Sequence, residues 1–506
     1  MIAPISAVDI GRFRAAIASR MGLWFDDGKL EFLANVLDRR LSADGEAAAR
    51  YLSKLENQAT AFDELREIAR EVTVGETYFF RHTDQFRAFA EVALPVRLEA
   101  REVVRQLRFL SAGCSSGEEA YSLSILTQRR LSGSPYDVVI KGVDINPNAV
   151  ERARAARYST WALRETPDDV QKQYFSLEGR DYRLSQAIRS SVQFEEENLV
   201  AADSWAAESF DVIFCRNVLM YFSPENAQRV VQRFSRALAP GGYLFLGHAE
   251  NLRGLSQDFE LCHTHGTFYY QRKPGTATPS EFKFIEPAAP APRSALALDW
   301  ASTWLETVQR SSDRIRSLTE QPRAERAPEP VLSRAAAPPG LNLSLALELL
   351  SHERFTEALE VLSRLPTSAA KDADAVLLRA ALLAQCGQLE AAEGACAELL
   401  SIDSLNAGAH YLRSLCRERQ ADMGAAIEHG QIATYLDPTF AMPHLHLGLI
   451  ARRLGDRDTA QRELAQAAVL LQREDASRLL LFGGGFSREG LIALCQSELS
   501  RLGIQG

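Results

Sequence analysis

Apolar residues recur at the spacing of an amphipathic helix through the first part of the chain. Ile10, Phe13 and Ile17 form one such series, and a second series surrounds Val36. Spacings of three and four place these side chains on one face of a helix. The pattern predicts a helical subdomain over residues 1–72. Because no residue in it suggests chemistry, we interpret it as a cap or a docking surface.

From about residue 105 the pattern changes to short apolar runs that alternate with helical segments. This alternation is typical of an α/β fold with a largely parallel sheet. Asn146 and Ser223 each stand before a proline, and a capping side chain before a proline at the first helical position marks a helix start. The expected strands are 108–111, 138–143, 192–194, 210–215, 243–246 and 267–271, with helices beginning at residues 118, 147 and 224.

Residues 274–338 differ in composition from the segments on either side. They are rich in proline and alanine, with one helical stretch near residues 295–318. Such composition favours an extended, unpacked chain. We therefore expect a linker between two folded parts.

Residues 339–472 contain an internal repeat. Small residues recur every 34 positions in two series, which are Ala346, Ala380, Ser414 and Gly448, and Ala358, Ala392, Ala426 and Ala460. This helix-turn-helix period resembles the tetratricopeptide repeat, in which small residues let paired helices pack closely. Such arrays form a superhelix with a concave groove that binds peptides. We expect four repeats that bind a protein or peptide ligand, followed by capping helices over residues 473–506.

Composition and charge exclude several classes of protein. Of 506 residues, 46% are hydrophobic and 24% are charged, as in globular proteins. The net charge is −9, and residues 1–274 carry 34 basic and 37 acidic residues, which gives no field for binding phosphates. The seven cysteines lack CxxC spacing, and we see neither a signal peptide nor an apolar run of membrane length. We expect a cytoplasmic protein without metal, nucleic-acid partner or membrane insertion.

The α/β region carries the candidate chemistry. Gly113 begins a loop of small residues that runs into a helix at Glu118, and glycine lets a backbone approach a ligand near the N–H donors of a helix start. Asp144 ends the next strand, where an acidic residue typically binds a ribose diol. The Gly-x-Gly-x-x-Gly motif of nicotinamide enzymes is missing. A polar strand end after 210–215, a helix, and the turn Leu-Ala-Pro-Gly-Gly before another strand are characteristic of S-adenosylmethionine-dependent methyltransferases.

Five motifs in order make a family resemblance specific. They are TVGETYFFR (73–81), AGCSSGEEAYS (112–122), GVDIN (142–146), FCRNVLMYF (214–222) and GHAEN (247–251). Over residues 10–272 the chain resembles the chemotaxis-receptor methyltransferases of the CheR type, and with its repeats it resembles the branch that carries C-terminal tetratricopeptide repeats. The resemblance implies a Rossmann-like class I S-adenosylmethionine-dependent methyltransferase domain over residues 73–273. It also implies a small β-subdomain at about residues 174–194.

The resemblance further implies which residues bind S-adenosylmethionine. Nine are expected to do so, matching contacts to the methionine part (Thr77, Arg81, Glu118), the ribose (Asp144), the adenine (Asn198, Leu199) and the sulfonium (Asn217, Val218), with Gly113 giving backbone access. The family often has asparagine two positions before the matched threonine, where this chain has Gly75.

The acceptor implied by the family is a glutamate side chain on a receptor's cytoplasmic helix. Its ordinary pKa is about 4.3, so the carboxylate is an anion at neutral pH and no general base is required. The enzyme must align this carboxylate with the methyl group and the sulfur. Tyr221 and Arg216 are the candidate orienting residues, and Tyr221 is preferred because a close arginine would also stabilise the ground state. Cys114 and Cys215 are interpreted as packing residues, and His248 as structural.

Two other functions stay open at this point. An RNA or nucleobase methyltransferase commonly carries Asp/Asn-Pro-Pro-aromatic at this strand end, where the chain has Arg-Asn-Val-Leu. An inactive adaptor would act through the repeats alone and would have no need of Glu118, Asp144 or Asn217. Segment 174–194 is compact, with Gly179 as its one glycine, so we expect no dependence on a receptor's C-terminal peptide. The repeats would then select the partner and recruit the enzyme to membrane receptor arrays.

Overall fold

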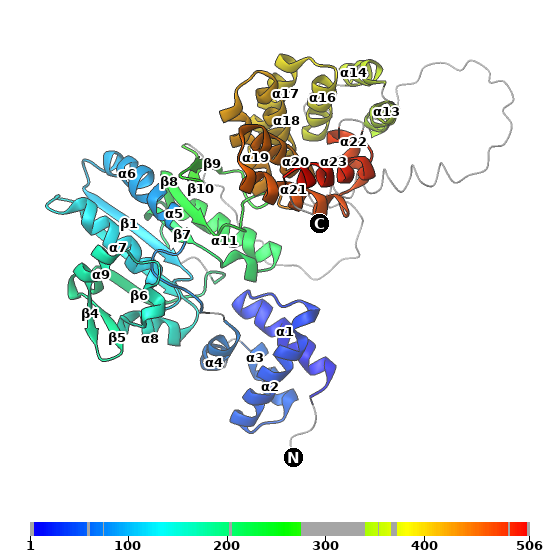
Figure 1. Ribbon diagram of the computed structural model, residues 1–506. Coiled ribbons are helices and arrows are strands. Elements are labelled where there is room, and N and C mark those ends of the chain that lie inside the picture. The colour runs from blue at the N-terminus through cyan, green and yellow to red at the C-terminus, as the bar shows by residue number, and fades with distance from the viewer. Residues whose placement is uncertain are drawn as a thin grey trace. The chain divides into compact units, whose positions relative to one another are not determined.

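The computed structural model describes residues 5–57, 61–73, 75–201, 205–274, 340–352, 354–365, 372–483 and 486–502. The chain divides into two compact units, Met1–Lys283 and Phe284–Gly506 (Figure 1). The expected linker, with its helical stretch near residues 295–318, lies almost entirely outside the described residues. Within the described ranges, no helix is long and apolar enough to cross a membrane.

The first unit begins with four helices that pack around one apolar cluster. They are α1 (Ala7–Met21), α2 (Leu30–Asp44), α3 (Ala48–Glu56) and α4 (Phe62–Val72). The periodic residues Phe13, Ile17 and Val36 are fully buried in this cluster. A capping box between Ser6 and Asp9 begins α1, because side-chain oxygens satisfy the unpaired N–H groups of a first turn.

A seven-stranded sheet forms the centre of the first unit. Its strands are β1 (Gln106–Ala112), β2 (Asp137–Asp144), β6 (Val192–Glu196), β7 (Phe210–Cys215), β8 (Leu238–Leu246), β9 (Phe259–Thr264) and β10 (Thr267–Arg272). The order is β6-β2-β1-β7-β8-β10-β9, and β10 pairs antiparallel with both of its neighbours. The chain moves outward from β1 to β2 and β6, then returns to β7 on the other side. The strand order therefore reverses between β1 and β7.

The remaining helices of this unit connect and cover the sheet. They are α5 (Thr83–Ala88), α6 (Leu94–Ala100), α7 (Glu118–Leu131), α8 (Pro147–Ala155), α9 (Asp168–Tyr174), α10 (Gln186–Arg189) and α11 (Pro224–Ala237). The predicted helix starts at Glu118, Pro147 and Pro224 are confirmed. The Asn146 side chain accepts the N–H groups of Asn148 and Ala149, and Ser223 caps α11 in the same way.

The small β-subdomain differs in its limits from the expected segment 174–194. Its three strands are β3 (Arg157–Tyr158), β4 (Phe175–Glu178) and β5 (Asp181–Leu184), in the order β3-β5-β4. The segment 192–196 belongs instead to the large sheet, because β6 pairs in parallel with β2. A two-residue strand far from its partner along the chain leaves no periodic signal, so sequence patterns miss it.

The second unit consists of antiparallel helix pairs at the spacing of the repeat. They are α13 (Gly340–Ser351) and α14 (Phe355–Ser363), α16 (Ala373–Gln385) and α17 (Leu389–Ile402), α18 (Ala407–Arg419) and α19 (Met423–Leu436), and α20 (Ala441–Leu454) and α21 (Arg457–Leu471). Ala380, Ser414, Ala392 and Ala426 are fully buried, as close helix packing requires.

Two more helices follow the repeats, α22 (Ala476–Phe482) and α23 (Arg488–Arg501). We expected both to cap the array. The helix α23 packs against the last repeat helix, α21, and α22 packs against α13 and α16. A helix of seven residues has no stable structure of its own, so tertiary contacts decide where it lies.

Candidate functional site

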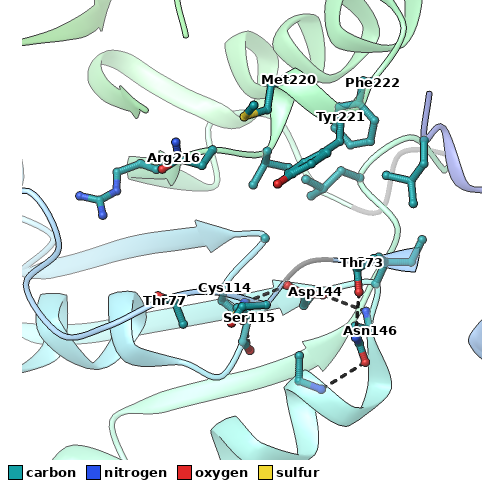
Figure 2. Close-up of a pocket in the computed structure, with 18 of the residues that line it drawn as sticks. Thr73, Thr77, Cys114, Ser115, Asp144, Asn146, Arg216, Met220, Tyr221 and Phe222 are labelled. Carbon is teal, nitrogen blue, oxygen red and sulfur yellow. Dashed lines mark hydrogen bonds between the residues drawn. The ribbon is translucent and has the colours of Figure 1, made fainter. Parts of the chain in front are cut away.

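A cavity of about 360 Å³ lies at the carboxyl ends of β1, β2 and β7. In open parallel sheets, ligands bind at these strand ends where the strand order reverses. Figure 2 shows two facing walls, one with Thr77, Cys114, Ser115 and Asp144, and the other with Arg216 and Tyr221. Ten of the eleven site residues expected from the sequence line this cavity, and Glu118 does not.

Asp144 is the last residue of β2 and presents a carboxylate to the cavity. One of its oxygens accepts the backbone N–H of Ser115 at 2.8 Å, and the other accepts that of Asn146 at 2.8 Å. Burial raises the pKa of Asp144, and the backbone N–H groups of Asn146 and Ser115 act against this rise. Each carboxylate oxygen can accept a second bond, so the group can also take a diol.

Gly113 brings the first wall close to the second. Its φ is +73°, in the left-handed region that glycine adopts without cost. A Cβ on this residue would lie 2.4 Å from the Cγ2 methyl of Val218, far inside van der Waals contact. The glycine is therefore required so that the loop after β1 can pack against the loop after β7.

Of the two glutamates that begin α7, Glu119 lines the cavity and the expected Glu118 does not. Glu118 is buried elsewhere, with the Ser116 hydroxyl donating to its carboxylate at 2.8 Å. Glu119 accepts a hydrogen bond from Ser111 at 2.7 Å. Neighbouring helix residues point about 100° apart, so only one of two successive glutamates in the first turn of α7 can face the site.

Arg216 lines the cavity but is already paired. Its Nε lies 2.9 Å from a Glu119 carboxylate oxygen, and its side chain is almost fully buried. It also donates to the backbone oxygen of Arg81 at 2.6 Å and to the Gln85 side chain at 3.1 Å. Burial raises the pKa of Glu119, and the charge of Arg216 opposes that rise. This pairing ties Arg216 to the wall of the site and argues against its expected role in orienting an acceptor.

The loop after β7 is held by a carboxylate to which the sequence analysis assigned no role. Glu250, within the motif GHAEN, is buried, and its two oxygens accept backbone N–H groups from this loop. One oxygen takes those of Asn217 at 2.7 Å and Gly247 at 2.8 Å, and the other takes those of Val218 at 2.8 Å and Met220 at 3.3 Å. Asn217 has a φ of 59°, which a residue other than glycine rarely adopts. Glu250 therefore positions the loop that carries Asn217 and Val218.

Asn198 and Leu199 line the cavity beyond β6. The Asn198 side chain is committed to the fold, because its amide donates to the Arg20 carbonyl at 2.9 Å and its oxygen accepts the Val200 N–H at 3.0 Å. Leu199 is buried and offers an apolar surface. What this segment can offer to an adenine is therefore the Leu199 side chain and the backbone, and its adenine contacts stay a prediction.

Thr77 and Arg81 approach the cavity from the segment before α5. The Arg81 guanidinium donates to the Glu76 carbonyl at 3.0 Å and lies 5.7 Å from the Tyr78 ring centre. Gly75 also lines the cavity, and its carbonyl accepts the Ser115 hydroxyl at 3.3 Å. At this position a glycine has no side chain to donate, which removes the hydrogen bond that the family's asparagine would supply.

The helical subdomain contributes a wall that sequence reasoning missed. Met21, the last residue of α1, lines the cavity together with Leu23, Trp24 and Phe25. The Trp24 N–H donates to the backbone oxygen of Tyr221 at 2.7 Å, and Leu23 forms a β-bridge with Phe222. The available signal was the apolar run Leu23-Trp24-Phe25 after Gly22, the glycine that ends α1.

Tyr221 and Trp24 mark the mouth of the cavity. Tyr221 is 38% exposed and Trp24 is 54% exposed, and the neighbouring Met220 is also exposed. Figure 2 shows the Tyr221 hydroxyl directed into the space between the two walls. A side chain that enters from outside would meet this hydroxyl.

The other reactive side chains near the site have structural environments. Cys114 and Cys215 are buried, and burial raises the pKa of both thiols well above the ordinary value. The His248 ring lies 4.1 Å from the His82 ring, and burial lowers the pKa of both imidazoles, that of His82 to about 4. Burial therefore favours protonated thiols and neutral imidazoles near neutral pH.

The cavity suits S-adenosylmethionine. Asp144 provides a carboxylate at the strand end for a ribose diol, and Leu199 with Ile145 provides apolar surface for a base. Arg81 and Glu119, which also pairs with Arg216, provide opposite charges for the two ends of an amino acid. The donor set and the volume both fit this cofactor.

Comparison with known proteins gives the family. Residues 75–268 match the model described as CheR methyltransferase, SAM binding domain. The chain is 33% identical to chemotaxis protein methyltransferase 2 of Vibrio cholerae, over 54% of this chain and 95% of that protein. It is 31% identical to chemotaxis protein methyltransferase 1 of Pseudomonas aeruginosa, over 52% of this chain and 98% of that protein.

A further relative extends across the repeats as well. The probable biofilm formation methyltransferase WspC of Pseudomonas putida is 28% identical over 90% of this chain and 97% of that protein. The methyltransferase domain, the cofactor class and the helical repeats expected from the sequence thus agree with the fold and with these relatives. The chain therefore belongs to the CheR family of S-adenosylmethionine-dependent methyltransferases.

Proposed function

We propose that this enzyme methylates glutamate side chains of chemoreceptors, as a protein-glutamate O-methyltransferase of a chemosensory pathway. Relatives named as chemotaxis and biofilm methyltransferases support this class of substrate. The observation that carries the proposal is the position of Tyr221, half-exposed at the cavity mouth with its hydroxyl directed inward. This opening accepts a side chain presented on a protein surface.

The cofactor would be held by residues of both walls. Asp144 takes the ribose, Leu199 lies against the adenine, and Arg81 with Glu119 takes the amino acid end. Glu119 replaces Glu118 in this role because Glu119 lines the cavity. When bound, S-adenosylmethionine supplies a methyl group attached to a positively charged sulfur.

The acceptor carboxylate would be oriented by Tyr221. A glutamate is an anion at neutral pH, with an ordinary pKa of about 4.3, so the enzyme does not need to remove a proton. The Tyr221 hydroxyl donates to one carboxylate oxygen and leaves the other free to attack. Arg216 is the less suited of the two candidates, because Glu119 engages its Nε and Gln85 with the Arg81 carbonyl engages its Nη1. Holding the reacting atoms in line is the main contribution that this arrangement can make.

Transfer of a radiolabelled methyl group tests the substrate class. The full-length enzyme is incubated with labelled S-adenosylmethionine and either a receptor cytoplasmic fragment or total RNA, with Asp144→Ala as the inactive control. We expect label on the receptor, released as methanol by mild base, because a glutamyl methyl ester is base-labile. Label on RNA would replace the proposal with a nucleic-acid methyltransferase, and the absence of cofactor binding would replace it with an adaptor.

The repeats would supply partner selection, including recruitment to receptor arrays. Stacked helix pairs present an extended face to protein ligands, and the small three-stranded sheet is compact, with a two-residue turn between β4 and β5. Chains with and without residues 275–506 are compared for receptor methylation and cellular localisation. We expect the shorter chain to bind cofactor normally and to lose localisation. Loss of methylation on removal of a receptor's C-terminal peptide would instead assign targeting to the small sheet.

A further inference from the structure

The helix α22 lies against the first helices of the repeat pairs, the surface that a tetratricopeptide array offers to ligands. It packs against α13 and α16. Phe482 of α22 also lies beside Tyr411 of α18 and Phe440, which precedes α20. We call this surface the groove face, defined by Leu377, Gln385, Gly408, Tyr411, Asp437 and Phe440. Figure 1 shows α22, from the C-terminal part of the chain, beside α13, the first helix of the repeats.

Phe482 is the apolar anchor of α22. Its side chain is 6% exposed, and its ring centre lies 5.0 Å from that of Phe440 and 5.8 Å from that of Tyr411. A Cβ at Gly408 would lie 3.0 Å from the tip of the Phe482 ring. The groove face therefore has a pocket for one large aromatic side chain, and the glycine provides its floor.

Two polar contacts complete the site. The Gln385 side chain donates to the backbone carbonyl of Leu481 at 3.2 Å. The Arg478 guanidinium donates to Asp437 at 2.6 Å and lies 5.3 Å from the Phe440 ring centre, and the charged groups of Arg478 and Asp437 are both nearly buried. An aromatic anchor, an amide bound to the backbone and a desolvated ion pair are the contacts by which grooves bind helical peptides.

Neighbouring helices hold the ends of the segment that contains α22. The next helix, α23, packs directly on α21 and continues the stack. Arg488, at the start of α23, donates to the carbonyls of Leu471 at 2.9 Å and Glu474 at 2.7 Å. Arg488 thus joins the start of the segment that contains α22 to its end. The Glu474 carboxylate, which also pairs with Arg478, accepts the N–H of Ala441 in α20 at 2.7 Å. A seven-residue helix has no stability by itself, so α22 is folded only where the groove face orders it.

We propose that α22 is an internal ligand of the repeat domain and that the domain's protein partner binds in its place. The partner is a helical segment with arginine or lysine followed three and four positions later by leucine and phenylalanine. The cation pairs with Asp437, and the aromatic ring enters the pocket above Gly408. A tethered ligand acts at a high effective concentration, so the intact protein holds this site closed until the partner is abundant. This regulation concerns the repeats and is independent of the identity of the methyl acceptor.

Binding of a free peptide to the full-length protein tests the proposal. The probe is a fluorescein-labelled peptide of residues 474–483, measured by anisotropy. The double variant Arg478→Ala/Phe482→Ala releases α22, and Arg473→Ala/Phe486→Ala is the matched control, since both of its residues are exposed. We expect the released variant to bind the probe at least tenfold more tightly than the wild type and the control. Adding Asp437→Asn should reverse most of this gain. Equal affinity in all three proteins would overturn the proposal.

Hydrogen exchange of the wild type gives a second test that needs no variant. We expect α22 amides to exchange by local opening, faster than those of α20 and α21, and to exchange faster still with excess unlabelled peptide. Exchange of α22 only together with the whole repeat unit would make it a fixed part of the fold and overturn the proposal. Light scattering tests whether a second copy of the chain supplies the α22 that lies on the groove face. A wild-type dimer that becomes a monomer in the released variant would show that copies exchange α22.

Discussion

Replacing Glu250 by glutamine tests how the site is positioned. In the enzyme, the two carboxylate oxygens of Glu250 accept four backbone N–H groups, two on each oxygen. Glutamine keeps one oxygen and places an NH2 group where the other stood. Whichever way the glutamine amide is turned, its NH2 group faces two backbone N–H groups, and donors cannot bond to one another. Two of the four hydrogen bonds are therefore lost, together with the charged acceptor that holds the loop carrying Asn217, Val218 and Tyr221.

The size of the effect follows from these bonds. Hydrogen bonds to a charged group contribute about 1.5–3 kcal/mol each, so two of them sum to about 3–6 kcal/mol. Movement of the loop recovers part of this loss. We take the energy of one hydrogen bond, about 1.5–3 kcal/mol, as the net loss. Because 1.4 kcal/mol is a factor of ten, this loss corresponds to roughly 10- to 100-fold weaker binding of the cofactor.

Calorimetric titration with S-adenosylhomocysteine measures this affinity without turnover. The matched control is Glu102→Gln, which makes the same chemical change at an exposed position of the same unit. We expect Glu250→Gln to bind at least tenfold more weakly and to lose turnover, while Glu102→Gln behaves like the wild type. Unchanged affinity and turnover in a folded Glu250→Gln enzyme would refute the idea that this carboxylate holds the loop.

Three further predictions concern the cofactor, the acceptor and pH. Asp144→Ala should weaken S-adenosylmethionine binding about 10- to 100-fold, because charged hydrogen bonds of about 1.5–3 kcal/mol are lost; calorimetry that finds normal affinity removes the ribose assignment. Tyr221→Phe should lower turnover more than cofactor affinity, and steady-state rates beside a binding titration decide this. The repeat unit should lose stability as the pH falls from about 6.5 toward 4. Burial lowers the pKa of His410 to about 3 and of His429 to about 4, so the unfolded chain binds more protons in that range. Urea midpoints across this range should flatten for His429→Asn and not for the exposed His352→Asn; equal slopes would contradict the assignment.

The sequence by itself determined the elements whose signals are local. Apolar runs marked six strands of the large sheet, β1, β2, β6, β7, β8 and β10. The capping residues Asn146 and Ser223 marked the starts of α8 and α11. The 34-residue period determined the helix pairs of the second unit, because each pair needs small residues where its helices meet. Asp144 and Gly113 could be singled out for a related reason, since a strand end and a glycine loop are defined by neighbours along the chain.

Only the tertiary structure decided which side chains meet at the site. Glu118 and Glu119 are adjacent in sequence, and the rotation of α7 against the sheet determines which of them faces the cavity. Trp24 and Glu250 reach Tyr221 and its loop from distant segments, and no periodicity records such contacts. The same holds for α22, whose place on the groove face depends on a pocket built by three separate helices. Local patterns do not distinguish which glutamate faces the cavity, which distant segments meet the loop or where α22 lies, because each alternative allows the same local backbone. Long-range packing makes the selection.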